Sequence, residues 1–306
     1  MVTVESRTTE WAAGATRDSQ LFNFAWELKK QGLKESTIRT YTRYLSTLKK
    51  RGANLLDPES VKGVIARQEW DEKTKSLAIN AYSKFLEVNG GKWTPPKVRP
   101  TRKLPFIPLE EELDQLISGA NRKTTTFLQL LKETGMRSGE AWRLKWTDLD
   151  FKNGTVVLNE PEKYGKPRMF KIDPKLMAML NALPKQSDLV FGGQNLRNYG
   201  RVYRKYRSKM VFKLQNPRLK RISFHTFRHW KATMEYAKTK DILYVMEILG
   251  HRDIKTTLLY TQLVHFESED YHSAVAKTID EAKALVEAGF EYVCTHENVM
   301  LFRKRK

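Results

Sequence analysis

The sequence is poor in cysteine and in long apolar runs. Cys294 is its only cysteine, so it forms no intrachain disulfide and has no second thiol for a redox pair or a metal site. We assign Cys294 no role beyond packing. No apolar run approaches the roughly 20 residues that cross a bilayer, and no basic start followed by an apolar core opens the chain. These absences predict a cytoplasmic protein without membrane contact.

Acidic residues are also scarce. The 306 residues include 35 Asp and Glu against 55 Lys and Arg, which gives a formal charge of +20 and a pI near 9.8. Such an excess favours a polyanionic partner. A generally basic protein kept soluble by its charge is the alternative, and clustering of the basic residues speaks against it. The length suits two domains, and the 40% hydrophobic content is ordinary for a globular protein.

The first part of the chain predicts a loosely ordered start followed by a helical domain. Residues 1–19 mix small polar and charged residues without a period. Over residues 20–92, apolar residues such as Leu21, Ala25 and Leu28 recur at helical spacing, and turn residues divide the pattern into about four helices. We expect no strand in this domain.

A basic, proline-rich linker is predicted over residues 93–106. The stretch GGKWTPPKVRPTRKLPF, residues 90–106, has four prolines, five basic residues and no acid. Proline-rich segments are semi-rigid spacers, and cations along one suit a connector that crosses a phosphate backbone. An ordinary solvated linker is the alternative. The candidate DNA contacts in this segment are Lys97, Arg99, Arg102 and Lys103.

A second domain is predicted over residues 107–306. It opens with three consecutive acids at residues 110–112, as the helix macrodipole favours. The stretch GTVVLNEPEKYGKPRMFKI, residues 154–172, reads as a β-hairpin, and most of the remainder has helical periodicity. A tail from about residue 274 contains an apolar-periodic helix and then FEYVCTHENVMLFRKRK, typical of a short hairpin. The fold class is therefore mainly α with a small β-hairpin or sheet, α+β.

Residues 197–221 form the most basic segment. They include ten Lys or Arg and no acid, interleaved with aromatic residues. Solvated helix faces usually alternate in sign, because like charges at i,i+4 repel by roughly 0.2 to 0.5 kcal/mol per pair. Phosphates would supply the missing counter-charge. We expect DNA contacts from Arg201, Arg204, Lys205 and Arg207.

Two short stretches carry unusual polar residues. In TGMRSGEAWRLKWTDLD, residues 134–150, Arg137 stands between two glycines that allow close approach of the backbone to a bound group. In SFHTFRHW, residues 223–230, His225 and Arg228 share a helical face. Zinc binding by His225 and His229 is disfavoured, since the metalloprotease pattern needs a glutamate where this chain has threonine. We interpret His229 as a buried, hydrogen-bonded structural histidine.

The third stretch is ILGHRDIKTTLLYTQ, residues 248–262. Gly250 is a natural helix stop after an apolar helix, and His251 follows it in the turn. Asp253 can cap a short helix that carries Tyr260. Each residue alone is unremarkable in a core or a turn, whereas their combination with the two other stretches is hard to explain as packing.

Taken together, these stretches resemble the active site of the tyrosine recombinases, or phage-type integrases. The resemblance runs from about residue 20 to 265: the first box is matched by TGMRSGEAWRLKW, the second by HTFRH, and a leucine-glycine-histidine signature precedes a tyrosine nine residues on. The hairpin lysine falls on Lys163 if EKYGKPR aligns by its first lysine, with Lys166 as the competing choice. The implied catalytic residues are Arg137, Lys163, His225, Arg228, His251 and Tyr260.

The chemistry needs these residue types. Two forked, permanently charged arginines suit the clamping of a phosphodiester whose oxygens gain charge in the transition state, without a metal or other cofactor. A phenol, with a reference pKa near 10, needs a proton acceptor or a positive potential, and we expect His225 to assist. The resemblance implies that His251 donates to the phosphate and that the lysine protonates the leaving 5′ hydroxyl. Attack by Tyr260 would give a 3′-phosphotyrosine link.

The resemblance also implies an architecture. A SAM-like core-binding domain (20–92) and a catalytic domain (107–306) would clamp double-stranded DNA, with a homo-tetramer assembled on two recombination sites and accessory DNA-binding proteins as further partners. The roughly 20 residues before the first helix are too few for an arm-binding domain. The chain is therefore similar to the two-domain type of chromosome-dimer resolvases (Xer-like) and archaeal mobile-element integrases, acting at the nucleoid. Tail segments of the family dock on neighbouring protomers.

Two alternatives remain open. A type IB topoisomerase uses similar chemistry as a monomer, and a DNA-binding protein derived from a recombinase would lack catalysis. The domain layout and motif spacings favour a recombinase over the first, and an intact tyrosine with both arginines favours it over the second. Whether Tyr260 acts in cis or in trans is equally open.

Overall fold

The computed structural model describes residues 19–101, 103–192, 195–263, 271–296 and 298–305. The chain divides into two compact units, and the boundary between them in the sequence lies between residues 103 and 104. Residues 1–18 and Arg102, for which we predicted a loosely ordered start and a DNA contact, lie outside the described residues. Within the described ranges, no helix combines the length and apolar character needed to cross a membrane.

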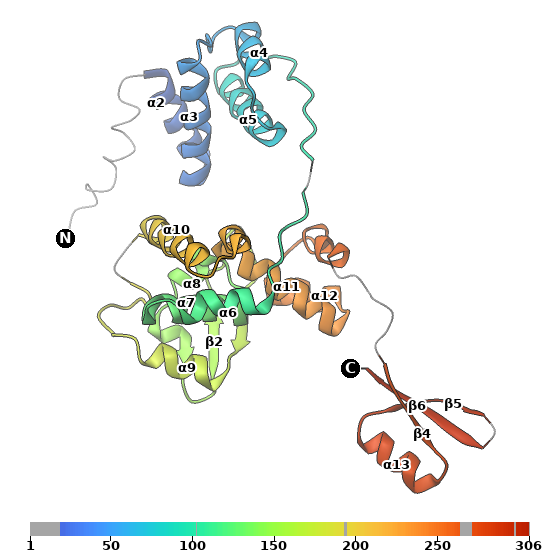
Figure 1. The fold of residues 1–306 in the computed structure, drawn as a ribbon. Coiled ribbons are helices and arrows are strands. Elements are labelled where there is room, and N and C mark those ends of the chain that lie inside the picture. Colours follow the sequence, from blue (N-terminus) through green and yellow to red (C-terminus); the bar gives the residue numbers. More distant parts are fainter. Residues whose placement is uncertain (1–18, 102, 193–194, 264–270, 297, 306) are drawn as a thin grey trace. The chain divides into compact units, whose positions relative to one another are not determined.

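Within its described residues, the first unit has four helices, as predicted (Figure 1). Their bounds are Ser19–Lys30 (α2), Glu35–Lys50 (α3), Pro58–Arg67 (α4) and Glu72–Val88 (α5). Asp57 and Asp71 cap α4 and α5, their carboxylates accepting hydrogen bonds from backbone N–H groups two and three residues on. Such caps satisfy donors that a helix start leaves unpaired. Its core is mainly aliphatic and includes an aromatic group in which the rings of Phe24 and Tyr82 both lie against Phe85.

The segment that follows α5 has no helix or strand among its described residues up to Glu110. Its start is anchored, because the Trp93 ring stands edge-on to Tyr82 at 4.6 Å and its indole N–H donates to Ser83. Lys97, Arg99 and Lys103 are exposed. The segment therefore carries solvent-exposed cations, which a basic linker requires.

The second unit is a helical body with a small antiparallel sheet. The sheet, of order β1-β2-β3, joins Leu149–Asp150 (β1), Thr155–Leu158 (β2) and Arg168–Lys171 (β3). The predicted hairpin is thus present, extended by a short strand that we did not predict. The helices are Glu110–Ser118 (α6), Arg122–Thr134 (α7), Ser138–Trp142 (α8), Pro174–Asn181 (α9), Leu196–Lys213 (α10), Phe224–Thr239 (α11) and Ile242–Leu249 (α12).

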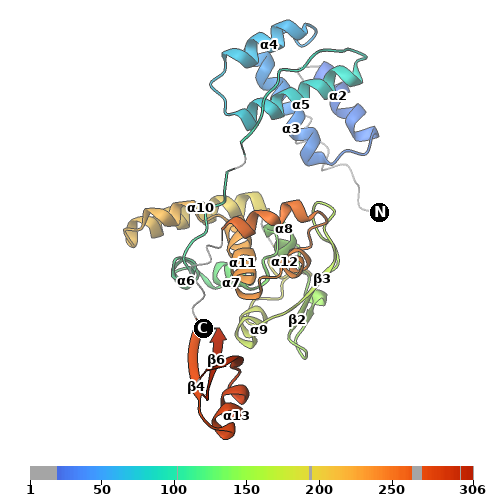
Figure 2. The same ribbon diagram turned by 90° about the vertical axis from the view of Figure 1, so that its right-hand side faces the viewer.

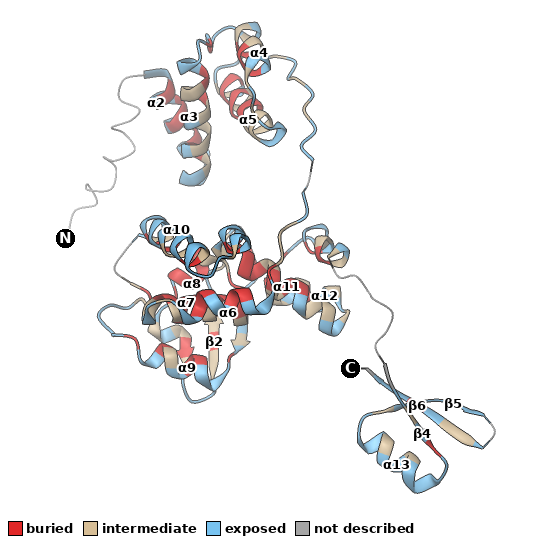
Figure 3. Ribbon diagram, in the orientation of Figure 1, coloured by how far each residue is buried: buried red, intermediate tan, exposed pale blue. Residues whose placement is uncertain are grey.

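An aromatic cluster forms the centre of this unit. The Phe127 ring, fully buried on α7, makes edge-to-face contacts at 5.1 to 5.5 Å with Trp142, Phe191, Tyr199 and Phe224. Figure 2 shows α7 and α11, which share this core, passing close to each other, and Figure 3 shows their buried faces. The cluster fixes α7, α8 and α11, the three helices that carry or adjoin the polar motifs.

The C-terminal residues form a module of one helix and three strands. Tyr271–Ala276 (β4), Glu291–His296 (β5) and Val299–Arg305 (β6) make an antiparallel sheet of order β4-β6-β5, and Ile279–Glu287 (α13) contacts it. The predicted helix and hairpin are present, whereas β4 was not predicted. Cys294, to which we assigned no role beyond packing, is exposed on β5. Figure 3 shows how little of the module is buried.

Replacement of Phe127 by alanine tests the aromatic cluster. Phe127→Ala removes a fully buried ring with four aromatic neighbours, and such truncations cost about 3 to 5 kcal/mol. Phe212→Ala is the matched control, because that ring is 79% exposed on α10 and its loss should change stability by less than about 0.5 kcal/mol. Urea unfolding followed by circular dichroism measures both. Equal effects of the two substitutions would contradict this description of the core.

Candidate active site

Arg228 occupies the centre of the polar motifs. It lies in the second turn of α11 and its side chain is 2% exposed. One guanidinium nitrogen donates to the carbonyl oxygen of Gly135 at 2.8 Å, and another to that of Leu249 at 2.6 Å. A single side chain therefore connects three sequence motifs that are up to 114 residues apart in the chain.

The two carbonyl groups belong to the ends of helices that stop in the same way. Gly135 ends α7 and Gly250 ends α12, each in the left-handed region with φ of +62°. A side chain at either position would be strained, and at Gly250 a β-carbon would collide with the Arg168 guanidinium. These two turns direct the next polar residues, Arg137 and His251, toward Arg228, which affects the pKa of His251 electrostatically.

The buried carboxylate of Glu140 holds two other arginines, Arg137 and Arg168. Glu140 is fully buried and forms ion pairs with Arg137 at 2.8 Å and with Arg168, from β3, at 2.7 Å. It also accepts the backbone N–H groups of Arg137 and Glu162. These cations and hydrogen bonds keep the pKa of Glu140 below its usual value despite burial, so it stays ionised at neutral pH. Arg168 was not among the predicted site residues.

The loop between β2 and β3 brings a lysine to this group. Lys163 and Tyr164 both have positive φ, and a hydrogen bond from the Gly165 N–H to the Glu162 carbonyl closes the turn. Two successive residues with positive φ are costly outside glycine and are often found at functional loops. Lys163 is exposed and close enough to lower the pKa of His225, while the Lys166 backbone N–H donates to the Gly250 carbonyl.

Tyr260 is carried by a short 3₁₀ helix, Leu258–Gln262 (η5), and is 3% exposed. Its ring packs in a small cluster with Ala232 of α11 and with Val245 and Leu249 of α12. Nearby, the buried His251 ring shares a hydrogen bond of 2.9 Å, through Nδ1, with the hydroxyl of Thr257. The nucleophile candidate is thus packed on the same two helices that carry Arg228 and Leu249.

The histidine at the Tyr260 hydroxyl is His229. Its Nδ1 lies 3.0 Å from the phenol oxygen, and the two rings are inclined at 52°. We expected His225 to assist this phenol, but the structure places the His225 ring against His229, edge to face at 4.6 Å. The prediction that His229 is hydrogen-bonded is confirmed. We did not predict its partner, Tyr260, because the two residues are 31 positions apart in the sequence.

The histidines of the site are held neutral. Burial, together with the charges of neighbouring cations, lowers the pKa of His251 to about 3 and that of His225 to about 4; His225 keeps part of its ring in solvent. Burial and the two neighbours His225 and Arg228 lower the pKa of His229 to about 4. Burial also lowers the pKa of Arg228, to about 9, which leaves it charged at neutral pH. The site therefore has a positive electrostatic potential, which favours binding of an anion.

The basic helix α10 has two distinct faces. Tyr199, Tyr203 and Tyr206 point into the protein and donate hydrogen bonds to Thr124, Ile222 and Leu116, so they serve as anchors. The outer face carries the predicted DNA contacts Arg201, Arg204 and Lys205, which are exposed. Arg207 differs, because it donates to the Ile222 carbonyl at 2.6 Å and lies over the Tyr203 ring.

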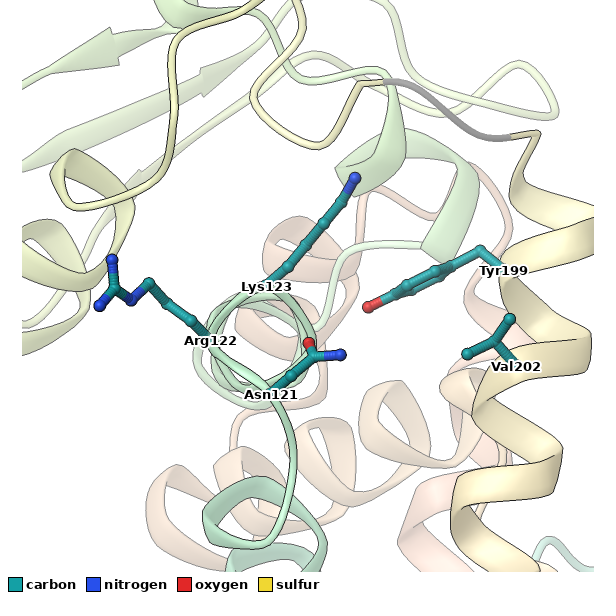
Figure 4. Close-up of a pocket in the computed structure, with 5 residues that line it drawn as sticks. All are labelled: Asn121, Arg122, Lys123, Tyr199 and Val202. Carbon is teal, nitrogen blue, oxygen red and sulfur yellow. The ribbon is translucent and has the colours of Figure 1, made fainter.

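A cavity of about 330 Å³ lies between α7 and α10, lined by Asn121, Arg122, Lys123, Tyr199 and Val202. None of these five lining side chains, drawn in Figure 4, is one of the residues around Arg228. The cluster, whose Arg228 and Tyr260 are buried, is therefore separate from this cavity. Among the described residues, no three His, Cys, Asp or Glu side chains are grouped to bind a metal ion.

Comparison with known proteins identifies the relatives of this arrangement. Residues 109–265, which include every motif described above, match the model of the phage integrase family. The chain belongs to the phage integrase family. It is 27% identical over 255 residues to the tyrosine recombinase XerA of Pyrococcus horikoshii, a match that covers 79% of this chain and 88% of the relative. As a Xer-like member of the family, the chain is an enzyme, a tyrosine-type site-specific recombinase.

Solved structures of integrases share the fold. The Tn1549 transposon integrase in complex with circular intermediate DNA aligns with a TM-score of 0.62 and 19% identity, covering 88% of this chain and 99% of that one. A lambda integrase tetramer bound to a Holliday junction aligns with a TM-score of 0.62 and 14% identity, covering 82% and 79%. At these identities the likeness concerns the fold of this integrase-family chain.

Neutralising Glu140 should destabilise the fold. Glu140→Gln leaves Arg137 and Arg168 facing each other without a counter-charge, and breaking a buried ion pair costs about 3 to 5 kcal/mol. Glu162→Gln is the control, because its pair with Arg143 is half exposed and worth about 0 to 1 kcal/mol. Urea midpoints measure the difference. A loss for Glu140→Gln no larger than for Glu162→Gln would contradict the central role of the carboxylate.

Acidification should weaken the fold before carboxylates titrate. His229 and His251 have pKa values of about 4 and 3 in the folded chain against about 6.5 unfolded, so the unfolded state binds protons first as pH falls. The contribution of each neutral histidine to the free energy of unfolding is fully present above about pH 6.5. It decreases toward pH 4 by up to about 1.4 kcal/mol per pH unit for each histidine. Urea unfolding at pH 7, 6 and 5 measures the slope, which His251→Asn should reduce. Constant stability from pH 7 to 5 would contradict the lowered values.

Proposed function

We propose that this chain cuts and rejoins DNA at specific sites through a 3′-phosphotyrosine intermediate, without metal or ATP. The observation that carries the proposal is the convergence around Arg228 of groups from the α7–α8 turn, from α11 itself and from η5. Arg137, His225 and Tyr260 each interact electrostatically with Arg228. The cluster of cations suits the binding of an anionic phosphodiester, and the buried phenol beside it suits attack on that group.

Each group has a role that its position supports. Arg137 and Arg228 clamp the non-bridging oxygens; two bonds of Arg228 go to carbonyl groups, and a guanidinium has five N–H donors, so donors are left for the phosphate. His225 and His251 face the same charged centre and donate to the phosphate. Lys163, exposed on its turn and close to His225, protonates the leaving 5′ oxygen, and we favour it over Lys166.

The reaction conserves bond energy. Attack of the Tyr260 oxygen on phosphorus replaces one phosphodiester by another, and a 5′ hydroxyl from a second strand reverses the step, so no nucleotide triphosphate is consumed. Charge stabilisation comes from the arginines, which stay protonated in the relevant pH range. The positive surface that they create also attracts the DNA backbone.

The wider assembly is proposed from charge and family. The exposed cations Lys97, Arg99 and Lys103 of the linker, with Arg201, Arg204 and Lys205 on α10, would contact DNA phosphates. XerH and Tn1549 integrase have been solved with DNA, and lambda integrase as a tetramer on a Holliday junction. We propose the same for this chain, a homo-tetramer on two sites at the nucleoid, assisted by accessory DNA-binding proteins and regulated by docking of the C-terminal module.

Replacement of Tyr260 separates binding from chemistry. Tyr260→Phe should bind DNA as the wild type does and form no covalent adduct, because it lacks the attacking oxygen. Tyr292→Phe is the matched control, since that tyrosine is exposed on β5. The measurement is incubation with a nicked and supercoiled DNA library, denaturation, and mass spectrometry of the trapped peptide with sequencing of the DNA ends. Adduct formation by Tyr260→Phe would remove the residue from its role; relaxation without strand exchange would favour a topoisomerase.

Replacement of Arg228 by lysine tests the forked clamp. Lysine keeps the charge but cannot span both carbonyl groups and the phosphate, so cleavage should lose about 3 to 4 kcal/mol of transition-state stabilisation. That loss corresponds to cleavage slower by roughly two to three orders of magnitude. Single-turnover cleavage measures it, with Arg252→Lys, an exposed neighbour of the same chemistry, as control. An unchanged rate for Arg228→Lys would show that the fork is dispensable.

A further inference from the structure

A histidine outside the family-derived set touches the nucleophile. His229 lies one residue after Arg228 on α11, and its Nδ1 is 3.0 Å from the hydroxyl oxygen of Tyr260. The hydroxyl of Thr233 bonds back to the His229 carbonyl, so the backbone at this turn is fixed by the helix and by a side chain. The contact thus joins helix α11 to the short 3₁₀ helix η5, which carries Tyr260.

The surroundings decide which way the hydrogen bond runs. His229 is partly buried beside Arg228 and His225, and these neighbours favour the neutral imidazole. A phenol with an ordinary pKa near 10 carries its proton at neutral pH. A neutral imidazole facing a protonated phenol through Nδ1 accepts that proton in the hydrogen bond, and its own proton then resides on Nε2.

A bound phosphate changes the balance at this histidine. The cations around the site lower its basicity, and a phosphodiester between Arg137 and Arg228 brings the compensating negative charge. Proton uptake by His229 therefore becomes easier when DNA is present. The acceptor gains strength in the complex in which the nucleophile is needed, and free enzyme keeps the phenol protonated and unreactive.

We propose that His229 is the proton acceptor for Tyr260 during strand cleavage and the donor that returns the proton during rejoining. This inference rests on the proposed function and adds a residue to it. As the Tyr260 oxygen bonds to phosphorus, its proton passes to His229 Nδ1 and the bond from phosphorus to the 5′ oxygen breaks, with that oxygen taking a proton from Lys163. In the reverse step a 5′ hydroxyl bonds to phosphorus and gives its proton to Lys163, the bond from phosphorus to the Tyr260 oxygen breaks, and the leaving phenolate recovers its proton from His229.

A purely structural hydrogen bond is the competing explanation, and two substitutions separate them. His229→Asn places an amide oxygen near the position of Nδ1, so it can accept the hydrogen bond but takes up no proton. His229→Ala removes both abilities. General base catalysis contributes typically about 10² to 10⁴-fold, so both variants should cleave at least about 100-fold more slowly than the wild type. Cleavage by His229→Asn within about threefold of the wild type would overturn the proposal.

The experiment uses the full chain and the DNA site recovered from wild-type adducts. DNA affinity and thermal unfolding are measured beside single-turnover cleavage, with His296→Asn, an exposed histidine on β5, as control. A substrate with sulfur in place of the 5′ bridging oxygen has a leaving group that needs no proton. It should restore cleavage by Lys163→Ala but not by His229→Asn. Restoration of His229→Asn by sulfur would move the residue to the leaving-group side and overturn the assignment.

The pH profile gives an independent readout. Without the acceptor only the phenolate attacks, and its fraction rises tenfold per pH unit as long as the phenol is mostly protonated. Cleavage by His229→Asn should therefore rise with unit slope from pH 7 to 9, while the wild-type rate levels off; a plateau in the variant would contradict the role. The other titratable groups at this position, His225, Arg228 and Tyr260, are common to both proteins. If the wild type forms no adduct with any DNA, the proposed function fails too.

Discussion

The two hydrogen bonds from Arg228 to backbone carbonyl groups are the constraint on which the site depends. They connect the ends of α7 and α12 to α11, so the residues that follow these ends are placed by the same guanidinium that we propose as a phosphate ligand. Backbone acceptors cannot rotate away as side chains do. The consequence is a preorganised clamp, whose geometry is set by the fold before any DNA arrives, which is the arrangement that electrostatic catalysis requires.

Charge is distributed unevenly around that clamp. Glu140 is a single buried carboxylate paired with two cations, Arg137 and Arg168, whereas Arg228 donates to uncharged carbonyl groups. The free chain therefore carries an electrostatic cost at its centre that histidines limit by staying neutral. In the proposed complex a phosphodiester relieves this cost, so that affinity for DNA and stability of the protein depend on the same interaction.

Much of this organisation could be predicted from sequence, because it rests on local signals. Helical periodicity, the glycine stops at Gly135 and Gly250, and the family boxes indicated the elements and five of the groups around Arg228. Contacts between distant segments carry no such signal. The pairing of His229 with Tyr260 and the burial of Arg168 against Glu140 arise from tertiary packing, and β4 became a strand only through pairing with β6. The hydroxyl partners of the α10 tyrosines likewise lie on segments distant in the chain, so the sequence did not indicate them.

The segment that carries Tyr260 differs in kind from its supports. α11 has sixteen residues and regular backbone bonding, whereas η5 has five residues in 3₁₀ geometry, which bonds less well and rarely extends far. Such a segment can open locally at a free energy well below that of global unfolding. Exposure of the proposed nucleophile, Tyr260, is therefore a separate equilibrium from the contacts that hold Arg228. Substitutions around η5 can change the first without changing the second.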